Sequence, residues 1–155
     1  MTSALIAKQF EFTYDSTQKN LSGITHEESL MRPSPGGNSL NWVLGHLVAT
    51  RNVVMQSLGE APAMNLEDAK QYERGTKPPV DNSAVRPLEE LVAALDRSQP
   101  VVVSRIRALT ASDLERQTPL GPLSELLAAL SFHEAYHVGQ FGLLRRLLGK
   151  DGAIA

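Results

Sequence analysis

The sequence predicts an all-α fold: a four-helix bundle of the up-down type with a long second connection. Three observations support this prediction. Four long stretches repeat apolar residues with the 3.6-residue period of a helix that buries one face. Proline and glycine separate these stretches, and no stretch alternates apolar and polar residues as a half-buried strand does. The 155 residues suffice for one core, so we expect a single domain over residues 1–155.

The first long helix is expected over residues 3–21, where a Ser-Gly pair ends it. A capping-box pattern follows, Thr25 with a glutamate three residues later, and it predicts a short helical turn. A segment rich in proline and glycine then leads to the second long helix, over residues 39–58, which has Asn38 or Ser39 as its expected N-cap.

The second connection, residues 60–86, is polar and longer than the loops of bundles usually are. It contains several prolines, and a short helix is expected within it at residues 66–72. A connection of this length is either a crossover along the bundle or a flap over one end of it. The sequence leaves both possibilities open.

The third long helix is expected over residues 87–109, with a kink or a local break at Pro100. A short helical turn capped by Ser112 or Asp113 then precedes the fourth helix, over residues 123–148. A glycine follows each of the second and fourth helices, where helices commonly end.

Composition excludes several classes of function. The net charge is −2 and no run of lysine or arginine stands out, which argues against nucleic-acid binding. The chain has no cysteine, so any metal must be held by nitrogen or oxygen atoms. No apolar run is long enough to span a bilayer and no signal segment begins the chain, so we expect a cytoplasmic protein without membrane contact.

Three histidines occupy positions where the helical pattern calls for apolar residues. His133 and His137 are four residues apart on the inward stripe of the fourth helix, so their rings can point at one place. His46 lies on the inward face of the second helix. Three imidazoles from two helices predict a metal site with an open coordination position, as catalytic sites have. The remaining histidine, His26, stands among glutamates and is expected at the surface.

The residues around the fourth-helix pair also match H-E-x-x-H, the helix pattern of zinc proteases, with Glu134 as the general base. No glutamate or histidine follows His137 to supply the usual third ligand, and strands are lacking in the predicted fold. These absences argue against a metalloprotease. Glu134 is therefore either a residue that acts on a metal-bound water or, the interpretation we favour, a charge between helices.

Two further residues are expected at the site. Gln140 follows His137 by three residues on nearly the same face, so it could hydrogen-bond a ligand histidine or a substrate. Trp42 precedes His46 by one helical turn and could form a wall of the pocket, although ordinary core packing is the commoner role of such a residue.

Two stretches of the sequence resemble the DinB-like (DNA-damage-inducible) metal-binding four-helix bundles: SLNWVLGHLVATRN, and much later FHEAYHVGQFGLLRRLLG. The resemblance implies that His46, His133 and His137 bind a divalent metal, zinc or nickel before iron or manganese. It also implies a homodimer packed through bundle helices. Bacillithiol S-transferases and mycothiol-dependent maleylpyruvate isomerase are related to this family, and in them the metal activates the thiol of a low-molecular-weight cofactor.

These observations favour a metal-dependent enzyme of the thiol-transferase, isomerase or hydrolase type that acts on a small electrophile. A metal ion lowers the pKa of a bound thiol or water and so makes a nucleophile available at neutral pH. The alternative is a non-catalytic, stress-associated metal-binding bundle. An open coordination position beside a pocket would favour the enzyme, whereas a fourth protein ligand that closes the site would favour the alternative.

Overall fold

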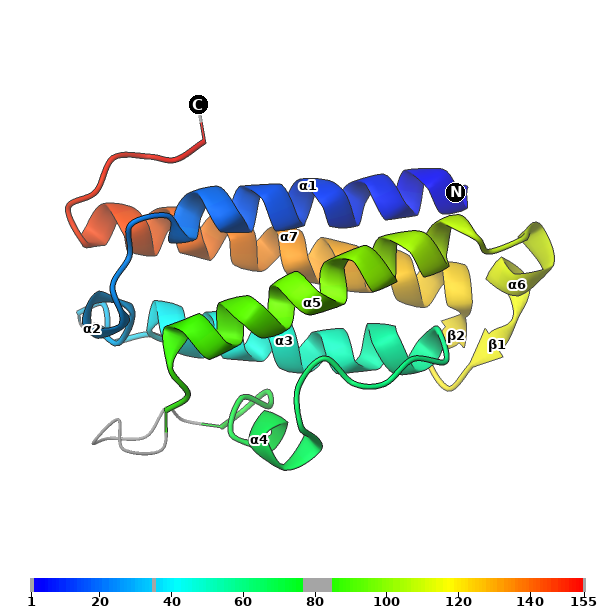
Figure 1. The fold of residues 1–155 in the computed structure, drawn as a ribbon, viewed down its shortest axis with the longest axis horizontal. Coiled ribbons are helices and arrows are strands. Elements are labelled where there is room, and N and C mark those ends of the chain that lie inside the picture. The colour runs from blue at the N-terminus through cyan, green and yellow to red at the C-terminus, as the bar shows by residue number, and fades with distance from the viewer. Residues whose placement is uncertain (1, 35, 77–84, 155) are drawn as a thin grey trace.

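The computed structural model describes residues 2–34, 36–76 and 85–154. Four long helices form a bundle (Figure 1), which confirms the predicted fold class. They are α1 (Ser3–Leu21), α3 (Leu40–Ser57), α5 (Leu88–Arg107) and α7 (Leu123–Leu147). The shorter elements are α2 (His26–Ser29), α4 (Leu66–Lys70), α6 (Ala111–Glu115) and the strands β1 (Gln117–Thr118) and β2 (Gly121–Pro122). The two strands pair antiparallel, with Gln117 opposite Pro122.

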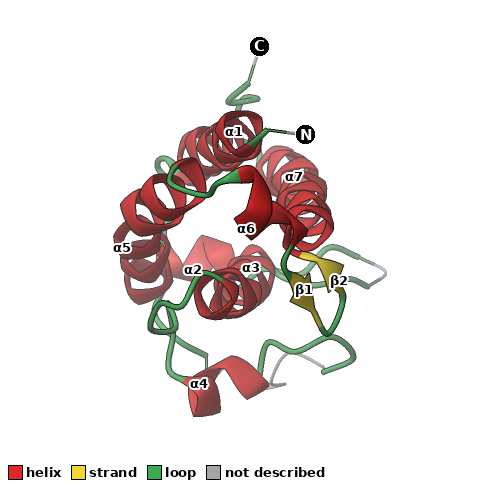
Figure 2. Ribbon diagram, turned by 90° about the vertical axis from the view of Figure 1, so that its right-hand side faces the viewer, coloured by secondary structure: helices red, strands yellow, loops and turns green. Residues whose placement is uncertain are grey.

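The order of the helices around the bundle places α1 and α3 on opposite sides. Each of them packs against both α5 and α7 (Figure 2). Figure 1 shows that α3 and α5 run in one direction, while α1 and α7 run in the other. The second connection is therefore a crossover that returns the chain along the bundle, one of the two possibilities for a segment of this length. It carries α4, and its residues 77–84 lie outside the described part of the chain.

Side-chain caps begin α2 and α3 where the sequence predicts. Ser39 accepts a hydrogen bond from the backbone of Trp42 at the start of α3, and Thr25 forms the expected capping box at α2. The expected cap of α6 was wrong. Thr110 is the N-cap, and its hydroxyl accepts from the backbone N–H of Asp113 while the carboxylate of Asp113 accepts from the Thr110 N–H. Asp113 is the third helical residue, the position that an acidic partner takes in a capping box.

Pro100 does not break its helix, since α5 is continuous from Leu88 to Arg107. Proline has no N–H to donate to the carbonyl of the residue four positions earlier, here Asp96. Both Asp96 and Pro100 are exposed. Water can solvate the unpaired carbonyl at such a position, so the missing hydrogen bond does not end the helix.

A buried polar network crosses the apolar core at the middle of the bundle. Arg51 and Glu134 are 1% and 2% exposed. Arg51 Nε donates to Glu134 Oε1 at 2.7 Å and Nη2 donates to Oε2 at 3.0 Å, a bidentate ion pair. Arg51 Nη1 donates to Ser98 Oγ at 3.1 Å, and Thr13 Oγ1 donates to Glu134 Oε2 at 2.7 Å. Each of the four long helices thus contributes one side chain to the network.

We predict that Glu134→Gln destabilises the protein by about 3–5 kcal/mol, because it leaves the Arg51 guanidinium buried without its counter-ion. Urea unfolding followed by circular dichroism measures the change. Glu125→Gln, at an exposed position of the same helix, is the control and should change the free energy of unfolding by less than about 1 kcal/mol. Arg51→Met combined with Glu134→Leu should regain most of the loss. A Glu134→Gln protein as stable as the wild type would contradict the prediction.

Candidate metal centre

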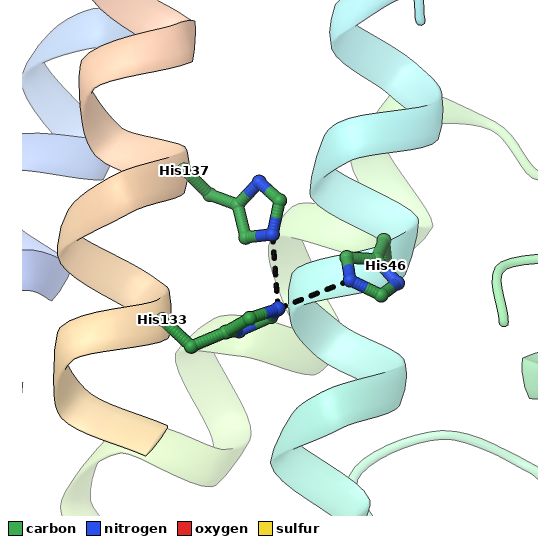
Figure 3. Close-up of side chains that lie close together, drawn as sticks. All are labelled: His46, His133 and His137. Atoms are coloured by element: carbon green, nitrogen blue, oxygen red, sulfur yellow. Dashed lines mark hydrogen bonds between the residues drawn. The ribbon is translucent and has the colours of Figure 1, made fainter. Parts of the chain in front are cut away.

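The three predicted histidines meet between α3 and α7 (Figure 3). His46 Nε2 lies 3.1 Å from His133 Nε2, which in turn lies 3.0 Å from His137 Nε2. They form a group that could hold a metal ion, and the described residues add no cysteine, carboxylate or further histidine to this group. The four-residue spacing of His133 and His137 brings their rings to one side of α7, as predicted.

The cluster lies at the seam between the two helices, away from the centre of the bundle. His137 is buried, but His46 and His133 are only half-buried. Arg51 and Glu134 occupy the centre of the bundle and are buried more completely than the three histidines. The seam position leaves one side of the cluster open to a pocket, so a small molecule can approach it without the helices moving apart.

In His46 and His137, the Nδ1 atom faces away from the cluster and makes a hydrogen bond. This hydrogen bond determines which ring nitrogen carries the hydrogen. His46 Nδ1 is 2.6 Å from the backbone oxygen of Tyr72, and His137 Nδ1 is 2.7 Å from Gln140 Oε1. Both partners are carbonyl oxygens, which only accept, so both Nδ1 atoms carry hydrogen. In the neutral rings the Nε2 atoms of His46 and His137 then present lone pairs toward His133. A ligand histidine held by such an outer hydrogen bond is the usual arrangement in metal sites.

Burial favours the neutral form of His133 and His137. Burial, together with the smaller effects of the neighbouring His137 and His46, lowers the pKa of His133 to about 4. Burial also lowers the pKa of His137, although the hydrogen bond to Gln140 opposes this shift. Near neutral pH these two rings are therefore unprotonated, the form that binds metal.

The donor set fits a transition metal. Imidazole nitrogens suit zinc, nickel, copper and iron. Nitrogen ligands that lie about 2.0–2.1 Å from one ion are roughly 3 Å from each other when they occupy adjacent coordination positions. The two Nε2 separations of 3.0 and 3.1 Å agree with this spacing. Two of the three pairs thus have the spacing of adjacent ligands, and the ligand atoms of all three histidines lie within 4.8 Å of one another, so the group could hold one ion.

Gly45 allows the crossover to support His46. A Cβ atom at position 45 would overlap the ring of Tyr72, which packs against α3 at this point. The Tyr72 side chain is 2% exposed, and its hydroxyl accepts from the backbone N–H of Arg86 at 3.2 Å. The ring and the hydroxyl together anchor the residue whose carbonyl orients His46. Sequence reasoning missed this contact, because a backbone carbonyl in an irregular segment has no side-chain signature.

A cavity of about 540 Å³ opens beside the three histidines. Trp42 lines the cavity, with its ring stacked on His46 at a centroid distance of 5.1 Å and an interplanar angle of 8°, and it also packs in the apolar core. Tyr136 also lines the cavity and packs edge-on against His137. The other lining residues are Asn38, Arg74, Gly75, Thr76 and Gln140. A metabolite-sized ligand fits a cavity of this volume.

Glu134 and His26 lie outside the cluster. Both carboxylate oxygens of Glu134 accept hydrogen bonds from the buried network, and Glu134 does not line the cavity. It is thus a charge between helices, the interpretation favoured above. His26 is half-buried and is not the freely exposed residue expected. Its Nδ1 accepts from the backbone N–H of Leu88 at 3.2 Å and so caps α5, whose N-cap Pro87 makes no side-chain cap.

The family model described as the DinB superfamily matches residues 9–141. The chain belongs to the DinB superfamily. The matched span contains all three histidines of the cluster together with α3, α5 and most of α1 and α7. No curated protein matches this DinB-superfamily chain. Among the described residues, none of its helices combines the length and the apolarity needed to cross a membrane.

We predict that Gly45→Ala displaces Tyr72 and costs about 1–3 kcal/mol of stability, because the added methyl group overpacks a filled site. Gly139→Ala on α7 is the matched control, since a Cβ there meets open space. It should be neutral or stabilise by up to about 1 kcal/mol. Urea unfolding measures both changes. Nitrogen NMR of the imidazoles should also show that His46 loses its fixed Nδ1–H form only in Gly45→Ala; an unchanged His46 would count against the role of Tyr72.

The metal-free protein should lose stability as the pH falls from 7 to 5. The folded state holds His133 at a pKa of about 4 while the unfolded chain titrates near 6.5, so protons bind preferentially to the unfolded state below pH 6.5. His133→Leu should weaken this dependence. Urea midpoints at pH 7 and 5, measured with a chelator present, provide the comparison. An equal loss of stability in the wild type and in His133→Leu would show that another group is responsible.

Proposed function

We propose that His46, His133 and His137 bind one divalent transition metal, zinc or nickel, and that the protein is a metal-dependent enzyme. Its reaction would join a low-molecular-weight thiol to a small electrophile, with isomerisation or hydrolysis as related chemistry of the same site. One observation carries this proposal: three imidazole Nε2 atoms meet beside an open cavity of about 540 Å³. Membership of the DinB superfamily supports it.

The residues of the chain would hold and shape the site. The Tyr72 carbonyl and Gln140 fix the rings of His46 and His137 with their Nε2 lone pairs toward the cluster. Trp42 and Tyr136 supply aromatic walls that limit the access of water to an apolar substrate group. A divalent ion bound here would act as a Lewis acid and lower the pKa of a thiol.

The transfer can be written in balanced form. The thiol loses its proton, and its sulfur forms a bond to the electrophilic carbon. The bond from that carbon to the leaving group breaks, and the leaving group departs with the electron pair and takes up the proton. Since the chain has no cysteine, both the sulfur and the electrophile come from outside the protein.

The cavity favours this enzyme over a non-catalytic metal-binding bundle, because a purely structural ion is usually enclosed by four protein ligands. The described residues offer three ligands in one group, and the cavity adjoins them. A metalloprotease has less support, since the carboxylate of Glu134 is engaged by Arg51 and Thr13.

Elemental analysis of the purified protein tests the metal site. The wild type should hold about one equivalent of metal, and His46→Ala should lose most of it, since two imidazoles bind an ion far more weakly than three. His26→Ala is the matched control: it removes a histidine outside the cluster and should keep the metal, although loss of the α5 cap should cost about 1 kcal/mol. Stoichiometric metal in His46→Ala would refute the three-histidine site.

The fluorescence of the single tryptophan provides a second, direct measure of metal binding at the same site. Trp42 stacks on His46, and no other tryptophan contributes to the fluorescence. Titration of the metal-free protein with nickel should therefore quench the emission to saturation at one equivalent in the wild type and in His26→Ala. Thiol transfer to a chlorodinitrobenzene should then follow the metal content and disappear with a chelator. A metal-loaded protein that is inactive with a panel of thiols and electrophiles would contradict the proposed reaction.

A further inference from the structure

Among the residues that the structure describes, one charged side chain besides the cluster lines the cavity beside the histidines. This side chain is Arg74, and none of the described lining residues is an aspartate or a glutamate. Three neutral imidazoles would also leave the full positive charge of a bound divalent ion uncompensated. We propose that the pocket selects a substrate carrying an anionic group, a carboxylate or a phosphate, and that Arg74 binds this group. The inference rests on the proposed function and names the chemical class of its substrate.

Arg74 differs from the paired arginines of the protein in having no carboxylate partner among the described residues, a state that it shares with Arg97. Arg86, Arg105 and Arg107 each form an ion pair with a carboxylate on the surface, and Arg51 is paired in the core. Arg74 forms no ion pair with any residue that the structure describes, and it is exposed at the cavity. A guanidinium in this state keeps its five donors available, and its planar fork matches a carboxylate or phosphate.

The segment that carries Arg74 is fixed relative to the cluster. Tyr72, two residues earlier, is buried and touches His46 through its carbonyl. Thr76, two residues later, closes the turn: its hydroxyl oxygen lies 2.8 Å from the carbonyl oxygens of both Gln71 and Glu73, and its one hydrogen can be donated to either. Gly75 has a φ of +90°, a backbone conformation that favours glycine, and it allows the chain to turn there. The cation and the histidines are thus held on the same cavity.

This arrangement predicts a ligand with two ends. One end, a sulfur or another donor, reaches the histidine cluster, and the anionic end reaches Arg74. Trp42 and Tyr136 lie on the same cavity and would pack against the part between them. The anion could be part of the thiol or part of the electrophile. The chemistry of recognition is the same in both cases, so an experiment must separate the two sources.

Two matched pairs of probes distinguish an anion carried by the thiol from an anion carried by the electrophile. Their binding to the nickel-loaded protein is measured by Trp42 fluorescence. 3-Mercaptopropionate and 2-mercaptoethanol differ in the carboxylate of a thiol. Succinate and 1,4-butanediol make the corresponding comparison without sulfur. We expect the anionic member of at least one pair to bind about tenfold more tightly than the neutral one, as one charge-assisted bidentate contact would give. The pair that shows the preference identifies the source of the anion.

Variants assign the preference to Arg74. Arg74→Ala should remove most of the tenfold preference, leaving only the part due to the charge of the ion, and should leave the affinity for the neutral probes unchanged, while Arg74→Lys should retain more of the preference. Arg97→Ala, an exposed arginine that lines a different cavity, is the control and should behave as the wild type. If neither anionic probe binds, or if its affinity is the same in Arg74→Ala, the inference is overturned.

The nickel content of the same samples separates this outcome from failure of the proposed function. Wild type that holds no nickel would contradict the metal site. Wild type that holds nickel but shows no dependence on Arg74 would contradict only the anionic substrate. The comparison of succinate with 1,4-butanediol is repeated with a chelator present. The contribution of Arg74 to anion binding is then measured both with and without a bound ion. Loss of the succinate preference in Arg74→Ala without metal would support the inference independently of the ion.

Discussion

The buried ion pair between Arg51 and Glu134 is the interaction on which the rest of the structure depends. It joins α3 to α7, the two helices that carry the three histidines. Glu134 is the residue directly after His133, and Arg51 follows His46 by five residues. A shift or rotation of one helix against the other would separate two buried charges, and leaving one unpaired costs several kcal/mol. The pair therefore fixes the relative position of the helices that the cluster requires.

This constraint also explains why the histidines lie at the seam. The charges occupy the centre of the bundle, where Thr13 and Ser98 complete their hydrogen bonds. The histidines take the edge of the same inward faces and open to a cavity. The crossover supplies the remaining support, since Tyr72 packs where Gly45 lacks a side chain and presents its carbonyl to His46. A long second connection thus contributes to the site as well as to the topology.

The helices and the three histidines could be predicted from the sequence because their signals are local and periodic. Proline or glycine lies in each connection between the long helices, and histidines in an apolar stripe are unusual. Arg51 could have been predicted as well. It lies on the buried face of α3 between Leu47 and Val54, and a charge there requires a partner of opposite sign on another inward face. Glu134, for which a charge between helices is the favoured interpretation, meets this requirement from the fourth helix.

Other features depend on tertiary structure and leave no such signal. The Tyr72 carbonyl and the Arg74 side chain belong to a segment without periodicity, so only the path of the crossover brings them to the cavity. The role of His26 as a cap of α5 likewise joins residues 62 positions apart in the chain. Pro100 shows the limit of a local rule, since its effect on a helix depends on whether the unpaired carbonyl faces solvent.

X-ray absorption spectroscopy of the zinc-loaded protein tests the central claim most directly, because it counts the imidazole ligands and measures their distances. The three-histidine site predicts three imidazole nitrogens at about 2.0–2.1 Å in the wild type, and at most two around any zinc that His46→Ala retains. A zinc environment with fewer imidazoles in the wild type, or one unchanged by His46→Ala, would contradict the assignment of the cluster as a metal site.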